Sequence, residues 1–414
     1  MNRRSWLTAK RLRAHGLLLA LTVWCLYLWT LATPGLRDRD ANLKGTDFLH
    51  FYTLGSLAIE QHGADLYNID AQATLAAQRV PAAAGIRYLP LYPPQVSLLF
   101  APLAYLPYPW ALALWWISSA STYALCCYAI WRSCPHLRQH RLTVAILAVG
   151  FPGFFNLIAW GQTSALALAC FTIFFFLMRT NRDFLAGIVL GCLIFKPQLG
   201  LAAGVLLVLL GAWKIVIGGA LSALAQLSIG AFYYGIAPLR KWFSMLWNAR
   251  KMSTLLEPKP YQTHCLRTFW SMLIPWSSLS IGLYVISAAV VIVWTILVWK
   301  RSQDWALRLS TLLLATVLVA PHLTVYDLVI LAAALLLMSD WAVARQPMPE
   351  SGVIGTMLYL VYVLPLAGPL LRGTHIQLSV VSMSILVYLI MKSTKTDRAS
   401  RSIEAPPSRQ VTTT

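Results

Sequence analysis

Charged side chains are scarce in this chain. They account for 11% of its 414 residues, whereas hydrophobic residues account for 58%. A soluble domain carries about 25% charged residues, so this composition excludes a water-soluble protein of the same length. The apolar residues also form runs of about 20, the length that crosses a bilayer. The clearest of these runs are 17–33, 111–131, 281–299 and 353–371. We therefore expect an all-α protein that crosses a membrane several times.

Acidic residues are the scarcest charged type. There are 14 Asp and Glu against 33 Lys and Arg, which gives a formal net charge of +19. In a soluble protein such a charge would suggest nucleic acid as the partner, but no soluble segment carries a basic stripe with interleaved aromatic residues. Short cytoplasmic loops of membrane proteins collect Lys and Arg. The charge therefore indicates orientation in the membrane, and nucleic acid is not a predicted partner.

Cysteines are also few, and most of the seven lie inside apolar runs with a spacing that fits no zinc site. Only Cys265 falls in a predicted outer loop, so no disulfide is expected there. A cleavable signal peptide is not expected either. Basic residues precede the first apolar run, but that run continues to Thr33 without an A-x-A cleavage site. Residues 1–14 are predicted to be a basic cytoplasmic N-terminus ahead of a retained first helix.

The distribution of Lys and Arg predicts the topology. With the N-terminus inside, residues 34–92 and 236–277 become outer loops, and the basic loops lie inside, as the positive-inside rule requires. The transmembrane domain covers 15–391. The polar, basic segment 392–414 is predicted to be a disordered cytoplasmic tail.

Two apolar segments decide how many spans the chain has. The stretch 93–107 is short and bracketed by prolines, so we interpret it as re-entrant or interfacial. The run 184–212 is broken at Lys196-Pro197 and crosses either once, kinked, or twice. If 93–107 does not cross and 184–212 crosses twice, the chain has about 12 spans. The alternative, in which 93–107 crosses, places the basic loop of 132–141 outside.

The first outer loop has its own helical pattern. Residues 46–62 place apolar side chains on one side of a helix, and a second short helix is expected over 70–80. We expect these amphipathic helices to lie on the membrane surface. No internal or inverted repeat of the kind found in transporters is visible.

Asp47 is the carboxylate most suited to catalysis. It follows the first helix in Thr46-Asp47-Phe48, where neighbouring aromatic residues would desolvate it and raise its pKa towards that of a useful general base. Its position is equally compatible with an N-cap of the following helix. Asp38 and Asp40 have the D-x-D spacing of a divalent metal site, although the arginine between them favours a solvated loop.

Further polar residues interrupt apolar sequence near the predicted outer ends of the spans. Lys196 must face protein, water or an anionic ligand, or else extend to the interface. His322, Tyr326 and Asp327 occur together, which favours function over a structural role for the histidine. Trp160-Gly161-Gln162 and Tyr92-Pro93-Pro94 predict shaped backbone that lines a cavity, although packing alone would also explain both.

Taken in order, these segments resemble glycosyltransferase family 87, of the GT-C superfamily. The resemblance covers residues 47–330, and the segments that carry it are Asp47 to Tyr52, Gly63 to Tyr67, Tyr92-Pro93-Pro94 with Ala101-Pro102-Leu103, Trp160-Gly161-Gln162, Lys196-Pro197-Gln198, and Pro321-His322 with Tyr326-Asp327. Members of this family are multi-spanning enzymes that take a sugar, typically mannose, from a polyprenyl phosphate. The resemblance implies a GT-C fold in the inner (plasma) membrane, with the active site on its periplasmic side and a lipid or glycan as acceptor.

By this resemblance Asp47 is the base that deprotonates the acceptor hydroxyl, and Lys196 and His322 lie near the donor phosphate. Arg240 and Lys241 are further sources of the positive charge that a phosphate leaving group needs. The residues implied to line the cavity or contact substrate are His50, Tyr52, Tyr92, Trp160, Gln162, Gln198, Tyr326 and Asp327. The chemistry implied is a single displacement with inversion that needs no cofactor, although Asp38 and Asp40 leave a divalent metal open.

Two other classes of function remain in competition. A transporter or flippase of a lipid-linked saccharide would show repeats and charges near the middle of the bilayer, whereas these charges gather towards one face. A membrane O-acyltransferase would use His322 as its base and would give Asp47 no role.

Overall fold

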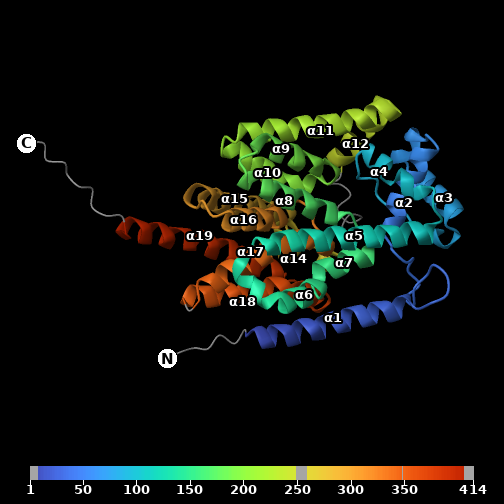
Figure 1. Ribbon diagram of the computed structural model, residues 1–414. Helices are drawn as coiled ribbons and strands as arrows, with labels where there is room; N and C mark the ends of the chain where they lie inside the picture. Colours follow the sequence, from blue (N-terminus) through green and yellow to red (C-terminus); the bar gives the residue numbers. More distant parts are fainter. Residues whose placement is uncertain (1–7, 249–258, 347, 405–414) are drawn as a thin grey trace, which may run out of the picture.

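The computed structural model describes residues 8–248, 259–346 and 348–404, and within these ranges the chain forms helices and no strand (Figure 1). The α-helices are α1 (Ala9–Leu31), α2 (Phe48–Ile59), α3 (Ile69–Arg79), α4 (Gln95–Ala104), α5 (Tyr108–Arg132), α6 (Arg141–Val149), α7 (Pro152–Trp160), α8 (Ser164–Arg179), α9 (Asp183–Gly191), α10 (Pro197–Leu209), α11 (Trp213–Tyr234), α12 (Ile236–Asn248), α14 (Leu266–Leu273), α15 (Ser277–Arg301), α16 (Trp305–Val319), α17 (Leu331–Ala344), α18 (Pro349–Val363) and α19 (Leu378–Glu404). The 3₁₀-helices are η1 (Gly63–Tyr67), η2 (Pro81–Ala83), η3 (Pro135–His140), η4 (Cys192–Phe195), η6 (Pro260–Gln262), η7 (Val325–Ile330) and η8 (Leu364–Arg372). The predicted all-α class is confirmed.

Several of these helices have the length and composition of membrane spans. Five qualify alone, and up to seven if each of two bent helix pairs counts as one span. The chain is thus an integral membrane protein, but the expectation of about 12 spans is not confirmed. The reason is that several apolar runs form helices shorter than a bilayer requires: α8 has 16 residues, α10 has 13 and α16 has 15.

The two ambiguous apolar segments are both broken. The stretch 93–107 contains α4, which is bent by 117° from α5, as a re-entrant or interfacial piece would be. The run 184–212 divides into α9, η4 and α10, and the break falls at Lys196, the N-cap residue of α10. Pro197 follows at the first helical position, where its missing N–H costs nothing. The sequence therefore predicts both interruptions correctly.

The first outer loop contains both expected helices, α2 and α3, but α2 does not lie on a surface. Every residue from Phe48 to Ala58 is buried, because α4 packs directly across it. Gly55 permits this contact, since a Cβ there would lie 2.4 Å from the backbone oxygen of Phe100. The prediction that this helix lies on the membrane surface is wrong, and the close approach of α4 is the reason.

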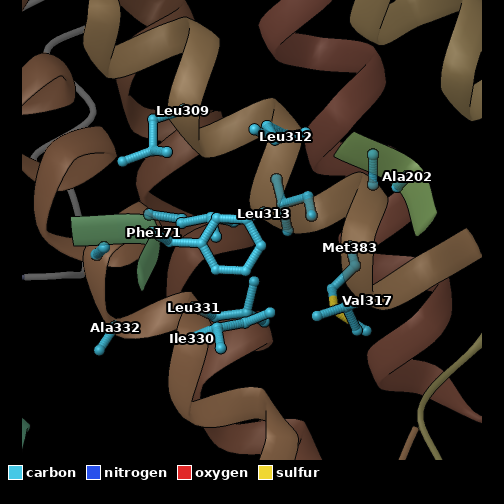
Figure 2. Close-up of a cluster of buried hydrophobic side chains, with 14 of the residues drawn as sticks. Phe171, Ala202, Leu309, Leu312, Leu313, Val317, Ile330, Leu331, Ala332 and Met383 are labelled. Atoms are coloured by element: carbon cyan, nitrogen blue, oxygen red, sulfur yellow. The ribbon is translucent and has the colours of Figure 1, made fainter. Parts of the chain in front are cut away.

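The hydrophobic core surrounds α16. This helix is apolar on all sides, and its residues 309–319 are all buried, as expected of a helix enclosed by others. Figure 2 shows Leu313 of α16 beside Phe171 of α8 and Leu331 at the start of α17, with Met383 of α19 nearby. This packing fixes η7, which joins the core to α7 and α8 and carries Asp327.

The two ends of the molecule differ in what they contain. Figure 1 shows α2, α3 and α4 together at one end, whereas the start of α1 and the last part of α19 lie towards the other. Helix α19 continues to Glu404, so it includes residues 392–404 of the segment predicted to be a disordered tail. Residues 405–414 lie outside the described residues.

Candidate functional site

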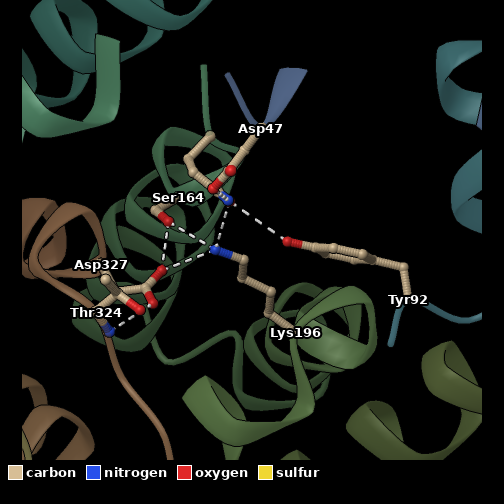
Figure 3. A network of polar contacts seen from close by, with 7 residues as sticks. Asp47, Tyr92, Ser164, Lys196, Thr324 and Asp327 are labelled. Carbon is tan, nitrogen blue, oxygen red and sulfur yellow. Dashed lines mark hydrogen bonds and ion pairs between the residues drawn. The ribbon is translucent and has the colours of Figure 1, made fainter. Parts of the chain in front are cut away.

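A buried ion pair lies at the centre of the candidate site. Lys196 Nζ is 2.8 Å from Asp327 Oδ1, and the two side chains are only 4% and 2% exposed. The same ammonium donates to Ser164 Oγ at 3.0 Å and to Gln162 Oε1 at 3.1 Å. A lysine has three N–H donors, so these contacts occupy all of them. Figure 3 shows the lysine pointing into this group of acceptors.

Asp327 is held in place from several sides. Its second carboxylate oxygen accepts from the backbone N–H of Thr324 at 3.4 Å, as part of the capping box that begins η7. Ser164, the first residue of α8, donates its hydroxyl proton to Oδ1. The ion pair therefore joins the break before α10 to the start of two other helices.

Gln162 connects this ion pair to Asp47. Its Nε2 donates to Asp47 Oδ2 at 2.6 Å, while its Oε1 accepts from Lys196 and, at 3.4 Å, from the hydroxyl of Tyr92. An amide can serve a donor and a carboxylate at once only in this orientation. Asp327, Lys196, Gln162 and Asp47 thus form a continuous chain of contacts.

The carboxylate of Asp47 does not cap α2, although the residue occupies the N-cap position. The N–H groups that a capping side chain would take are already used: Phe48 donates to Gly45 O, Leu49 to Thr46 O and His50 to Asp47 O. The N-cap interpretation is therefore wrong for the side chain. Only Oδ2 has a recorded hydrogen bond among the described residues, which leaves Oδ1 for another partner.

Trp160-Gly161-Gln162 holds Asp47 by both backbone and side chain. The carbonyl of Trp160 accepts the N–H of Asp47 at 3.0 Å. Gly161 has a φ of 66°, and a Cβ on it would lie 2.7 Å from Cβ of Phe48, so only glycine allows the two segments to meet. Gln162 then reaches the carboxylate. The contacts therefore explain the residue type at Gly161 and Gln162, whereas Trp160 contributes a backbone carbonyl.

The surroundings of Asp47 suit a general base. The residue lies between α1 and the α4–α5 pair, outside the candidate spans. Burial raises its pKa from 3.8 to about 6, while the hydrogen bond from Gln162 and the charge of Lys196 oppose this rise and Asp327 adds to it. A base with a pKa near the working pH transfers protons efficiently.

Two aromatic rings lie beside the network, and each is in contact with a lysine. The rings of Trp160 and Tyr326 are 6.2 Å apart. Lys196 Nζ lies 4.9 Å from the centroid of Tyr326, and Lys259 Nζ lies 5.9 Å from that of Trp160. Sequence reasoning did not select Lys259 as a site residue, because no motif surrounds it.

His50 lies one helical turn after Asp47 and is buried between tyrosines. Its ring is 5.2 Å from that of Tyr88 and 5.8 Å from that of Tyr92. Burial lowers its pKa to about 4, so the imidazole is neutral at physiological pH. Within the described residues neither ring nitrogen has a hydrogen-bond partner.

The remaining predicted site residues lie elsewhere in the structure. The Tyr52 hydroxyl donates to Leu106 O at 2.9 Å and anchors α2 to the α4–α5 turn. Gln198 is half-buried in the first turn of α10, and His322 is half-buried before η7. Arg240 shares α12 with Lys241, whose Nζ donates to the carbonyl of Ala64 in η1 at 3.3 Å.

Ser164 is a member of the network that sequence reasoning missed. It follows Trp160-Gly161-Gln162 by two positions, as the second of two hydroxyl residues at the start of an apolar run. A polar pair at a predicted outer helix end was therefore the available signal.

The structure shows how the D-x-D pair is used. Asp38 Oδ1 accepts the backbone N–H groups of Asp40 and Asn42, each at 2.9 Å, and so closes a turn. Within the described ranges, no group of three or more His, Cys, Asp or Glu residues is placed to hold a metal ion.

Comparison with known proteins gives one match. The family model described as glycosyltransferase family 87 matches residues 91–321, more than half of the chain. No curated protein and no solved structure matches. The matched region includes Gln162, Ser164 and Lys196, whereas Asp47 and Asp327 lie on either side of it.

Proposed function

We propose, from the premise that this chain belongs to glycosyltransferase family 87, that Asp47 is the catalytic base in transfer of a sugar from a polyprenyl phosphate to a lipid or glycan. Membership of the family makes the chain a membrane glycosyltransferase. Mannose is the first donor sugar to test. The observation that supports the proposal is the hydrogen bond from Gln162 to Asp47 Oδ2, backed by the buried Lys196–Asp327 pair.

The proposed reaction is a single displacement. The acceptor hydroxyl gives its proton to Asp47 Oδ1 while its oxygen bonds to the anomeric carbon. The bond from that carbon to the phosphate oxygen breaks, and the polyprenyl phosphate leaves with the electron pair. Attack from the face opposite the phosphate inverts the anomeric centre, so a β-linked donor yields an α-linked product. The reaction needs no cofactor, because one carboxylate base and cations at the phosphate supply its chemistry.

The contacts of Lys196 favour a positioning role over phosphate binding. Its charge is matched by Asp327, and its three donors are occupied. Taking an ion pair out of water costs several kcal/mol per ion, so we expect the Lys196–Asp327 pair to serve a purpose other than stability. Lys196 holds Gln162 Oε1, which directs Gln162 Nε2 at Asp47. The cations proposed at the phosphate are then His322, Arg240 and Lys241.

We further propose that the site faces the periplasmic side of the plasma membrane. Helix α5 begins beside the Asp47 segment, where Tyr108 donates to Lys44 O at 2.8 Å. It ends at Arg132, next to a cavity lined by Arg179 and Arg345 among others. The positive-inside rule makes the arginine-rich end cytoplasmic.

Sugar transfer by the purified protein in detergent tests the proposal. Polyprenyl-phosphate-mannose is supplied with a panel of membrane lipids and glycans, and wild type is compared with Asp47→Asn. Loss of a general base lowers kcat by about 10²–10⁴-fold. Asp70→Asn is the matched control, since Asp70 is an exposed carboxylate of the same outer loop, on α3, and pairs with Arg87; this variant should retain wild-type activity.

Folding of the Asn variant is checked by thermal unfolding at pH 8. Because the folded state raises the pKa of Asp47 to about 6, it binds the proton more tightly than the unfolded chain does. The stability contributed by this group is therefore greatest at low pH and falls as the pH rises through about 6. Asn cannot ionise, so the variant should be at least as stable as wild type at pH 8.

Other outcomes would contradict the proposal. Full activity in Asp47→Asn would move the base to another residue. If the protein uses an acyl donor, and if His322→Ala loses activity while Asp47→Asn keeps it, the protein is an O-acyltransferase instead. Movement of a lipid-linked saccharide across vesicles without any product would identify a flippase.

A further inference from the structure

A short strap, residues 259–265, connects two distant parts of the chain. The Gln377 side chain, fully buried ahead of α19, holds it from one side. Gln377 Nε2 lies 2.8 Å from Thr263 O, 2.9 Å from Tyr261 O and 3.3 Å from Pro260 O. Carbonyls that gather around one buried amide fix the path of the strap.

The strap is also attached to the segment that precedes Asp327. Thr263 and Thr324 form an antiparallel bridge, and the N–H of His264 donates to Leu323 O at 3.0 Å. On the other side of the strap, His264 Nδ1 lies 2.7 Å from Ser379 Oγ. The strap therefore joins the start of η7 to the start of α19.

Lys259, the first residue of the strap, lies over the ring of Trp160. Its Nζ is 5.9 Å from the ring of Trp160, the residue whose carbonyl accepts the N–H of Asp47. Lys259 is exposed, and no ion pair involving it is recorded among the described residues. It differs in both respects from Lys196, which is buried and paired with Asp327.

We propose that Lys259 binds the phosphate of the lipid-linked donor and neutralises the charge that develops as polyprenyl phosphate leaves. The inference rests on the proposed function and adds to it a further cation at the leaving group, besides His322, Arg240 and Lys241. An ammonium ion is a compact point charge on a flexible stem, suited to following a phosphate whose charge increases during the reaction. The strap is fixed from Pro260 onward by Gln377, while the Lys259 side chain is exposed and remains accessible to an anion that enters from the membrane.

Kinetics and binding together test this role. Lys259→Gln should lower kcat/KM for the donor by about 10- to 100-fold, the size of one hydrogen bond to a charged group, while KM for the acceptor stays unchanged. Lys259→Arg, which keeps the charge, should restore most of the loss. Arg87→Gln is the control, because Arg87 is an exposed cation of the first outer loop and should leave both constants unchanged.

A binding measurement separates this inference from the proposed function. Wild type is expected to bind polyprenyl phosphate at least tenfold more tightly than the uncharged polyprenol, and Lys259→Gln should clearly weaken that preference while its thermal unfolding stays unchanged. If wild type transfers sugar and prefers the phosphate, and Lys259→Gln does the same, only the inference is overturned. If wild type neither transfers sugar nor distinguishes the phosphate from the alcohol, the proposed function fails as well.

Discussion

Two acid–base pairs that differ in burial lie towards opposite ends of α5. Near its start, Lys196 and Asp327 are 4% and 2% exposed; beyond its last residue, His136 and Asp340 are 49% and 14% exposed, with 3.2 Å between Nδ1 and Oδ2. The helix has 25 residues, and at about 1.5 Å per residue it separates the two pairs by most of a bilayer. The Lys196–Asp327 pair is therefore closed to solvent, and the His136–Asp340 pair is open to it. They are called the closed pair and the open pair below.

The two pairs also differ in their contacts. Lys196 and Asp327 connect through Gln162 to Asp47, whereas His136 and Asp340 line a cavity of ≈ 370 Å³ together with Arg179 and Arg345. A buried ion pair is weak evidence for stability, because desolvation offsets the attraction. The closed pair is better explained by the geometry that it imposes on Gln162, and this explanation can be tested.

The largest effect is expected when the closed pair is broken. Lys196→Met leaves Asp327 as an unpaired buried charge and should cost about 3–5 kcal/mol of stability, measured by chemical or thermal unfolding in detergent. The double variant Lys196→Met/Asp327→Leu should recover part of that loss. A double variant as unstable as the sum of both single changes would show that the two residues do not act as a pair.

The next largest effect is expected when two glycines are replaced by alanine. Gly161, at the site, has a φ of 66°, and Gly211, before α11, has a φ of 68°. Left-handed backbone costs an alanine about 1–2 kcal/mol at either position. At Gly161 the new Cβ also meets Phe48 Cβ at 2.7 Å, whereas at Gly211 the nearest atom is Trp213 Nε1 at 3.9 Å. In Gly161→Ala overpacking adds about 1–3 kcal/mol to the loss in the free energy of unfolding, whereas in Gly211→Ala it adds nothing. Equal losses in the two variants, measured by unfolding in detergent, would contradict the close approach of Gly161 to Phe48.

The pH dependence of transfer tests the hydrogen bond between Gln162 and Asp47. If Asp47 is the base, as we propose, it must be ionised, so kcat/KM of wild type should fall as the pH drops through about 6. Gln162→Leu removes a bond that lowers this pKa, so the acidic limb should move to higher pH. The rate at pH 7 should fall by about tenfold, the worth of one bond to a charged group. A limb that stays in place would exclude Gln162 as the residue that orients Asp47.

The smallest effect is expected at the open pair. Asp340→Asn changes a His136–Asp340 contact whose histidine is half exposed, and exposed pairs of this kind contribute about 0–1 kcal/mol. The amide oxygen can still accept the N–H of Leu137, which lies 3.0 Å from Asp340 Oδ1. Sugar transfer should remain at the wild-type rate. A loss of transfer here would mean that the two ends are coupled.

Local sequence was sufficient for part of the fold. The apolar runs predicted an all-helical membrane protein, and prolines and Lys196 marked the breaks at α4 and α10. The burial of α2 was not predictable, because it depends on α4 packing over Gly55. The number of spans was overcounted relative to the helices that qualify for a similar reason: hydropathy does not distinguish a lipid-facing helix from a core helix such as α16.

What the sequence by itself determined was the chemistry available: the family motifs, the scarce carboxylates and the preference for Asp47. Only the tertiary structure decided how these groups are joined. Lys196 meets Asp327 across 131 positions, and Gln162 meets Asp47 across 115. Lys259, in a loop without a motif, comes to lie against Trp160. Hydropathy and turn signals depend on residues that are neighbours along the chain. Contacts between distant residues depend instead on how separate helices pack around a common core.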